Sequence, residues 1–250
     1  MKIFVVLPAY NEAENIPSLL EQFVKLKENP YLASKGIQLS IILVDDGSKE
    51  QTVQRAKDFS KKIQIIIEQH PHNLGLGQAL RTGFKKALSL VEEDDHDLIL
   101  TMDADNSHSP ELTLRMLKKI EEGYDLIIAS RYSPQGKEIG LNFLRRLLSF
   151  FCSFILRIFV PLKNVRDYSS GFRLIRAKFL KELAEKTKGD FFKDTGFVAT
   201  AEVLIELVKC GAKVEEVPLI LRYDLKKGKS KMNVVKTILG YGRLLFYKNS

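Results

Sequence analysis

Two aspartates separated by one residue stand directly after an apolar segment near the middle of the chain. Five of the six residues from Asp97 to Met102 are apolar or β-branched, which predicts a buried strand leading into Asp103 and Asp105. Carboxylates at the carboxyl end of a strand lie where open α/β sheets bind ligands. As hard oxygen donors, these two side chains suit Mg²⁺ or Mn²⁺ shared with a phosphorylated substrate. The alternative is an acidic, solvated turn between a strand and the next helix.

Further apolar segments alternate with amphipathic ones along the first half of the chain. We expect strands at 2–7, 39–44, 63–67 and 126–129, and helices at 14–27, 52–61, 78–90 and 111–121. This alternation predicts an α/β fold with a mostly parallel central sheet and helices on both faces. The carboxyl ends of parallel strands share one edge of the sheet. The residues expected to line a crevice there are Tyr10, Glu12, Asp45, Asp46, the 73–77 loop, Asp103, Asp105 and Arg131.

Composition and charge narrow the class of protein. The chain has 250 residues, 45% of them hydrophobic, and a net charge of +8, so it can bury a full core and favours an anionic partner. The positive charge is not interleaved with an aromatic stacking motif, and we therefore expect no nucleic-acid binding. Gly75 and Gly77 lack the third glycine of a dinucleotide fingerprint, and no P-loop lysine motif occurs. Cys152 and Cys210 form neither a CxxC pair nor a zinc pattern.

The alternation of strands and helices breaks after Arg131, where we expect a flexible link at 136–140, a polar loop at 166–173 and a final strand at 214–221. Residues 141–162 are richly apolar but contain three arginines, which argues against a membrane span. They predict a basic amphipathic helix lying in a membrane interface, with a long helix packed on the sheet as the alternative. Arg145 and Ser149 are four residues apart, so on a helix they share one face and could hold a phosphate together. The basic 226–231 loop is either a solvated charge run or a cover over phosphates.

Seven short motifs occur in order along the chain. They are PAYNE (8–12), VDDGS (44–48), NLGLG (73–77), DAD (103–105), SRY (130–132), SGFR (170–173) and SKM (230–232). Together they resemble those of inverting glycosyltransferases of the GT-A fold, in the branch of polyprenol-phosphate (dolichyl-phosphate) mannosyl and glucosyl synthases, and the resemblance covers nearly the whole chain. PAYNE and DAD are shared by many nucleotide-sugar transferases, whereas SGFR and SKM point to lipid-phosphate acceptors.

The resemblance implies roles for the matching residues. The nucleoside is expected to bind Pro8, Tyr10, Glu12, Asp45 and Asp46. Asp103 and Asp105 are expected to hold the metal and the sugar diphosphate, with Asp105 and Arg131 contributing most directly to catalysis. Relatives often carry Gln two residues after the second aspartate; here Ser107 takes that place as a candidate metal ligand, followed by His108. The acceptor phosphate is expected to bind Arg131, Arg145, Ser149, Ser230 and Lys231.

The expected reaction is metal-dependent transfer of a sugar, with inversion, from a nucleotide sugar of the GDP-mannose or UDP-glucose type to a polyprenyl (dolichyl) phosphate. A phosphate anion is already a nucleophile and needs no dedicated base. One alternative is transfer to a hydroxyl of a saccharide or glycolipid, which needs a base, and Asp167 is then the candidate. A further alternative is a non-catalytic nucleotide-binding protein associated with a membrane.

The same resemblance suggests how the chain is divided and where it works. We expect residues 1–135 to form the half that binds the nucleotide sugar. Residues 136–250 are expected to form the acceptor and membrane-interface half of the same catalytic domain, with amphipathic interface helices at 141–162 and 232–247. The expected location is peripheral, at the membrane surface on its cytoplasmic face.

Overall fold

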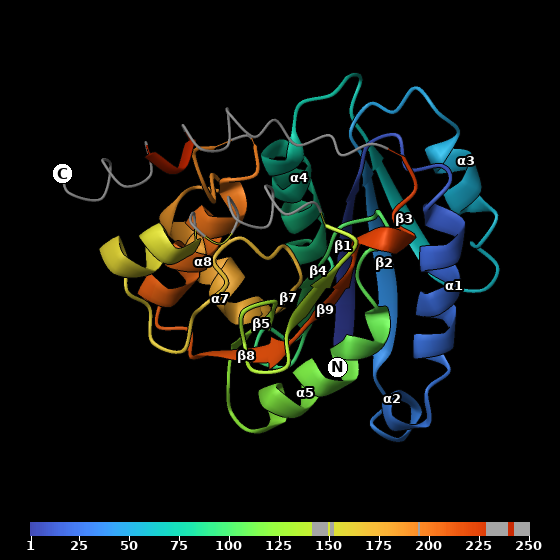
Figure 1. Ribbon diagram of the computed structural model, residues 1–250. Helices are drawn as coiled ribbons and strands as arrows, with labels where there is room; N and C mark the ends of the chain where they lie inside the picture. The colour runs from blue at the N-terminus through green and yellow to red at the C-terminus, as the bar shows by residue number, and fades with distance from the viewer. Residues whose placement is uncertain (142–149, 151–152, 195, 229–239, 243–250) are drawn as a thin grey trace.

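The computed structural model describes residues 1–141, 150, 153–194, 196–228 and 240–242, and it shows a central sheet with helices on both faces (Figure 1). Seven strands form the sheet in the order β3-β2-β1-β4-β7-β5-β8. All neighbouring strands are parallel except the two pairs made by β7, which runs antiparallel between β4 and β5. The predicted mostly parallel α/β sheet is confirmed. The strands are β1 (Lys2–Ala9), β2 (Gln38–Asp45), β3 (Gln64–Gln69), β4 (Leu98–Thr101), β5 (Leu126–Ser130), β7 (Arg173–Arg176) and β8 (Val214–Pro218).

Two apolar layers hold the helices against the sheet. Along β1, Ile3, Val5 and Leu7 belong to one layer, whereas Phe4 and Val6 belong to the other. Burial on both faces explains why the strands are continuous apolar runs rather than alternating ones. The first layer packs α1 (Ile16–Lys27), α3 (Thr52–Lys57) and α5 (Thr113–Glu121), and the second packs α4 (Leu76–Leu88), α7 (Ala177–Lys186) and α8 (Ala199–Lys209).

Helix α4 approaches the sheet closely enough to fix the glycine-bearing loop before it. A Cβ atom at Gly83 would lie 2.3 Å from Cγ1 of Val6 on β1, so only glycine fits between helix and strand. At the start of the helix, Gly75 has a φ of +96°, a backbone conformation that side chains other than glycine rarely adopt. These two glycines therefore position the 73–77 loop over the ends of β1 and β2.

The second half of the chain contains strands that the sequence pattern did not predict. No strand was predicted at β7, which begins at the last residue of the polar loop expected at 166–173, because only Leu174 and Ile175 are apolar between its terminal arginines. Strand β6 (Lys137–Ile139), expected as a flexible link, pairs in parallel with β9 (Ile220–Arg222) in a second sheet. The single strand expected at 214–221 is divided into β8 and β9. Three shorter elements are α2 (Pro30–Ser34) and the 3₁₀ turns η1 (Pro110–Leu112) and η2 (Tyr223–Leu225), and residues 153–159 and 240–242 are helical as well.

Candidate active site at the carboxyl edge of the sheet

Asp103 and Asp105 lie just beyond β4, at the carboxyl edge of the sheet. Asp105 is buried. Its Oδ1 accepts hydrogen bonds from the backbone N–H (3.1 Å) and the hydroxyl (2.5 Å) of Ser107. Its Oδ2 accepts a hydrogen bond from Nζ of Lys226 at 2.6 Å. Both carboxylate oxygens of Asp105 therefore have partners within the protein.

Burial and charge compete at the two carboxylates. Burial raises the pKa of Asp103, and the neighbouring Asp105 carboxylate adds to the rise against the positive charges of Lys226 and Arg131. Burial acts in the same direction on Asp105, but the ammonium of Lys226 outweighs it and lowers the pKa of Asp105. The aspartate pair thus already has one cation in contact, and Arg131 is close enough to influence Asp103.

The donor set at this edge fits a hard divalent cation. Mg²⁺ is commonly held by one or two carboxylates, while phosphates and waters supply the other ligands, and Asp103 and Asp105 provide that number. The hydroxyl of Ser107 donates to Asp105, so in this arrangement it orients the carboxylate, and its role as a metal ligand stays a prediction. Among the residues that the structure describes, no three His, Cys, Asp or Glu side chains are grouped to hold a metal ion. The remaining ligands would have to come from the substrate and from water.

His108 is a buried residue of this site to which the sequence pattern gave no role. Its side chain packs beside Phe172, with ring centroids 5.4 Å apart. Its Nδ1 has no hydrogen-bond partner within the described part of the chain. Because an unsatisfied buried nitrogen costs free energy, this atom marks a position where a ligand or a water can bind. The only sequence signal was a histidine directly after Ser107.

The adjacent aspartates at the end of β2 have different surroundings. Asp46 accepts hydrogen bonds from the backbone N–H groups of Leu74 and Gly75, each at 2.9 Å, and contacts Nδ1 of His70 at 2.7 Å. Asp46 therefore ties β2 to the 73–77 loop. Asp45 is equally buried, but its Oδ1 has no partner among the described residues. Of the two, Asp45 has the oxygen that is available to accept a hydrogen bond from a ligand.

The opening motif is joined to the loop after β2. Pro8 lies within β1, whereas Tyr10 and Glu12 follow the strand. The backbone N–H of Glu12 donates to the hydroxyl of Thr52 at 3.1 Å, and its carboxylate accepts a hydrogen bond from the side-chain amide of Asn15 at 2.6 Å. The structure thus brings the residues expected to bind the nucleoside to the adjoining ends of β1 and β2.

Arg131 stands at the end of β5 and is bound by two carboxylates. Its Nε and Nη2 each lie 2.8 Å from Asp167, and Nη1 lies 3.3 Å from Oε1 of Glu138. Asp167 is fully buried and also accepts hydrogen bonds from the backbone N–H groups of Ser169 and Ser170. Burial would raise the pKa of Asp167, but the guanidinium of Arg131 lowers it. Asp167 is therefore an ionised structural partner of Arg131, which the sequence could not distinguish from a base.

A row of aromatic rings leads from Arg131 to an exposed apolar surface. The guanidinium carbon of Arg131 lies 5.0 Å from the ring centroid of Tyr132, and the Tyr132 ring lies 5.8 Å from that of Phe150. The rings of Phe150 and Phe154 stack at 6.2 Å. The helical residues 153–159 bury Leu156 and, together with Phe150, expose a set of large apolar side chains. We call this set the apolar face: Phe150, Phe154, Ile155, Ile158 and Phe159.

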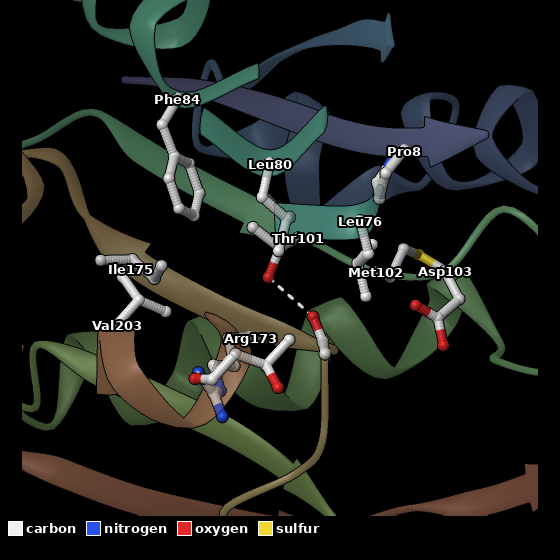
Figure 2. Close-up of a pocket in the computed structure, with 12 residues that line it drawn as sticks. Pro8, Leu76, Leu80, Phe84, Thr101, Met102, Asp103, Arg173, Ile175 and Val203 are labelled. Carbon is white, nitrogen blue, oxygen red and sulfur yellow. Dashed lines mark hydrogen bonds between the residues drawn. The ribbon is translucent and has the colours of Figure 1, made fainter. Parts of the chain in front are cut away.

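A cavity lies behind Asp103, between α4, β4, β7 and α8 (Figure 2). Its lining is largely apolar, and the hydroxyl of Thr101 donates to the carbonyl of Gly171 at 2.7 Å across it. Arg173 lies at the opposite side of the cavity from Asp103 in this view. Its guanidinium donates to the carbonyls of Tyr168 and Thr200, and burial lowers its pKa to about 10. Arg173 thus fixes the loop before β7 onto α8.

Several predicted site residues lie outside the described part of the chain. These are Arg145, Ser149, Ser230 and Lys231, together with 142–149 and 151–152 of the helix expected at 141–162 and most of the helix expected at 232–247. Within the described segments, no helix is long and apolar enough to cross a membrane.

Comparison with known proteins identifies the family. The family model described as glycosyl transferase family 2 matches residues 4–184, and the chain belongs to this family. A dolichol-phosphate mannosyltransferase from Pyrococcus furiosus is 32% identical over 247 residues, covering 98% of this chain and 63% of the relative. The chain thus spans less than two thirds of that relative's length. An undecaprenyl-phosphate mannosyltransferase from Micrococcus luteus is 28% identical over 234 residues, covering 93% of this chain and 85% of the relative.

Solved structures identify the fold. Glucosyl-3-phosphoglycerate synthase from Mycobacterium tuberculosis, in complex with Mn²⁺, UDP and glucosyl-3-phosphoglycerate, matches with a TM-score of 0.64 at 20% identity, covering 96% of this chain and 76% of the other. A structure of the same enzyme with Mg²⁺ and UDP matches with a TM-score of 0.62 at 20% identity, covering 94% and 74%. The chain therefore has the GT-A fold expected from its motifs.

Proposed function

We propose that this protein transfers a sugar from a nucleotide sugar to the phosphate of a polyprenyl phosphate, with inversion at the sugar carbon. The observation that carries the proposal is the row of aromatic rings from Arg131 to the apolar face. An acceptor that joins an anion to a long apolar chain can place its anion at Arg131 and its apolar chain against the apolar face. The names of the relatives from Pyrococcus furiosus and Micrococcus luteus, both polyprenyl-phosphate mannosyltransferases, support the same acceptor class.

The nucleotide sugar is proposed to lie across the end of β1. β1 stands between β2 and β4, so Asp45 and Asp103 are about two strand spacings, or ~10 Å, apart. Oδ1 of Asp45, which has no partner in the described part of the chain, suits an N–H donor of the nucleotide base, with Tyr10, Glu12 and Asp46 around it. The diphosphate would then meet Asp103 and Asp105, which are proposed to hold Mg²⁺ or Mn²⁺. A donor of the GDP-mannose or UDP-glucose type fits this arrangement.

The proposed mechanism requires no base from the protein. Held by Asp103 and Asp105, the metal ion would supply positive charge to the leaving nucleoside diphosphate. The acceptor phosphate attacks as an anion, and its oxygen becomes the glycosidic oxygen. Asp167, the base candidate for a hydroxyl acceptor, is instead saturated by Arg131 and two backbone N–H groups. Arg131, with Arg145, Ser149, Ser230 and Lys231, is proposed to orient the phosphate.

The apolar face is proposed to rest on the cytoplasmic surface of a membrane. Phe159 is 63% exposed and Ile158 57% exposed, and they directly follow the likewise exposed Arg157. Apolar side chains beside a basic one are typical of segments that enter the interface of an anionic membrane. Such contact would place the phosphate of a membrane lipid on the same side of the molecule as Arg131.

The test is a panel of donors and acceptors. The protein is incubated with GDP-mannose or UDP-glucose and with a polyprenyl phosphate, the matching polyprenol or a free saccharide, in the presence of Mg²⁺ or Mn²⁺. The products are identified by mass spectrometry. We expect a hexosyl polyprenyl phosphate. Arg145→Ala should lower kcat/KM for the acceptor by about tenfold to a hundredfold through a lost charged hydrogen bond, and Arg145→Lys should restore part of it. Transfer to the polyprenol or saccharide alone, with acceptor kinetics unchanged in Arg145→Ala, would favour the base-catalysed alternative.

A further inference from the structure

The candidate metal site already holds a cation of the protein. Nζ of Lys226 lies 2.6 Å from Oδ2 of Asp105, and the two side chains are only 10% and 9% exposed. The charge of Asp103 also acts on Lys226. The other oxygen of Asp105 is bound by Ser107. A metal ion at Oδ2 of Asp105 would therefore compete with the ammonium of Lys226 for the same oxygen and would be repelled by its charge.

Lys226 is held at this position from two sides. The side-chain oxygen of Asn15 accepts a hydrogen bond from the backbone N–H of Lys227 at 3.0 Å, and the amide of Asn15 donates to the Lys227 carbonyl at 3.1 Å. The same amide donates to Glu12. Nζ of Lys226 also lies 5.4 Å from the ring centroid of Tyr223. The start of the basic loop is thereby attached to the opening motif and to the aspartate pair at once.

We infer that Lys226 is a displaceable cation, which neutralises Asp105 in the free protein and must be displaced when a divalent metal ion binds. This inference rests on the part of the proposed function that assigns a metal to Asp103 and Asp105. A displaced ammonium is left beside the site and needs a new anion. The diphosphate that arrives with the metal provides one. Lys226 would thus make metal binding weak by itself and strong with a nucleoside diphosphate, which is a coupling between the two ligands.

The decisive measurement is Mn²⁺ binding, followed by electron paramagnetic resonance of the free ion and without any acceptor. We expect Lys226→Ala to bind Mn²⁺ alone about tenfold more tightly than the wild type, because the metal no longer competes with a charge-assisted hydrogen bond. In the presence of UDP or GDP this advantage should shrink or reverse. Lys226→Met, which keeps the aliphatic stem beside Tyr223, should behave in the same way if the alanine variant folds poorly.

Lys227→Ala is the matched control, because it removes the same charge from the next residue, whose side chain is exposed. It should change Mn²⁺ affinity by less than about threefold, the effect of a screened surface charge. Equal affinities of Lys226→Ala and Lys227→Ala would overturn the inference, and so would undetectable Mn²⁺ binding by all the variants. Failure of the acceptor panel leaves these affinities unaffected, so that the acceptor assignment and the role of Lys226 are judged separately.

Discussion

Replacing Asp167 by Asn separates a structural role for this carboxylate from a role as a base. In the structure Asp167 is fully buried and forms two hydrogen bonds of 2.8 Å with the side chain of Arg131. Removing one partner of a buried ion pair costs about 3–5 kcal/mol, because the remaining charge stays buried. Glu138, 3.3 Å from Arg131, still compensates part of its charge, so we expect the free energy of unfolding to fall by about 3 kcal/mol.

Urea denaturation followed by circular dichroism measures this loss directly. Asp94→Asn is the matched control: Asp94 pairs with Lys181 at 2.5 Å, but both side chains are exposed, and its loss should cost less than about 1 kcal/mol. Turnover alone is not decisive, since Arg131 would also be misplaced in the Asp167 variant. If Asp167→Asn were as stable as the control and yet inactive, the structural assignment would be refuted and a base would be indicated.

The pH dependence of stability provides a second test of the ion pair between Asp167 and Arg131. Arg131 lowers the pKa of Asp167 in the folded protein below its unfolded value, which is about 3.9 for aspartate. The ion pair therefore contributes its full stabilisation above that unfolded value and loses it as the pH falls through the folded pKa. The difference between wild type and Asp167→Asn should be constant near neutrality and shrink in acid.

Three further predictions concern the metal site, the binding of the nucleotide base and the contact with a membrane. Asp105→Asn should lower the free energy of unfolding by about 1–3 kcal/mol because it leaves Lys226 without its anion, whereas Asp103→Asn should lower it hardly at all. Both variants should lose most turnover, and near-normal turnover of the double variant would refute the metal site. Asp45→Asn should weaken binding of the matching nucleoside diphosphate by about tenfold in calorimetry without loss of stability, because Oδ1 of Asp45 has no partner among the described residues. Unchanged affinity would show that Asp45 does not bind the nucleotide base. Phe154→Glu should lower sedimentation with anionic vesicles by roughly tenfold, and high salt should weaken wild-type binding; equal partitioning of variant and wild type would exclude insertion of the apolar face.

The sheet was predictable where each strand carries its own apolar signal. The helices expected at 14–27 and 111–121 correspond to α1 (Ile16–Lys27) and α5 (Thr113–Glu121), and the strand expected around Leu98 is β4. Strand β7 escaped prediction because its signal is only two apolar residues. What makes it a strand is pairing with β4 and β5, which are separated from it by more than 40 residues in the sequence. Such pairing is a tertiary effect that local patterns do not contain.

The site was predictable as a set of residues but not as a set of partners. Motif order and the shared edge of parallel strands were enough to bring Asp45, Asp46, Asp103 and Asp105 to one end of the sheet. Which carboxylate is already paired depends on rotamers and on loops distant in sequence. Lys226 is 121 residues from the aspartate that it contacts. No spacing rule connects two such positions, and from the sequence the basic loop could therefore be interpreted only as a solvated charge run or a cover over phosphates.

The pairing of charges indicates where ligand binding can gain free energy. Asp105 is matched by Lys226, Asp167 by Arg131, and Asp46 by the backbone N–H groups of its loop. Asp45 keeps an unpartnered oxygen among the described residues, and burial raises the pKa of Asp103. A ligand gains most binding free energy at buried polar groups that lack a partner in the folded chain. There its hydrogen bond removes a desolvation cost, whereas elsewhere it would have to break an existing bond. These two aspartates stand on either side of β1, and we therefore propose that the nucleotide lies across that strand, with its base at β2 and its diphosphate at β4.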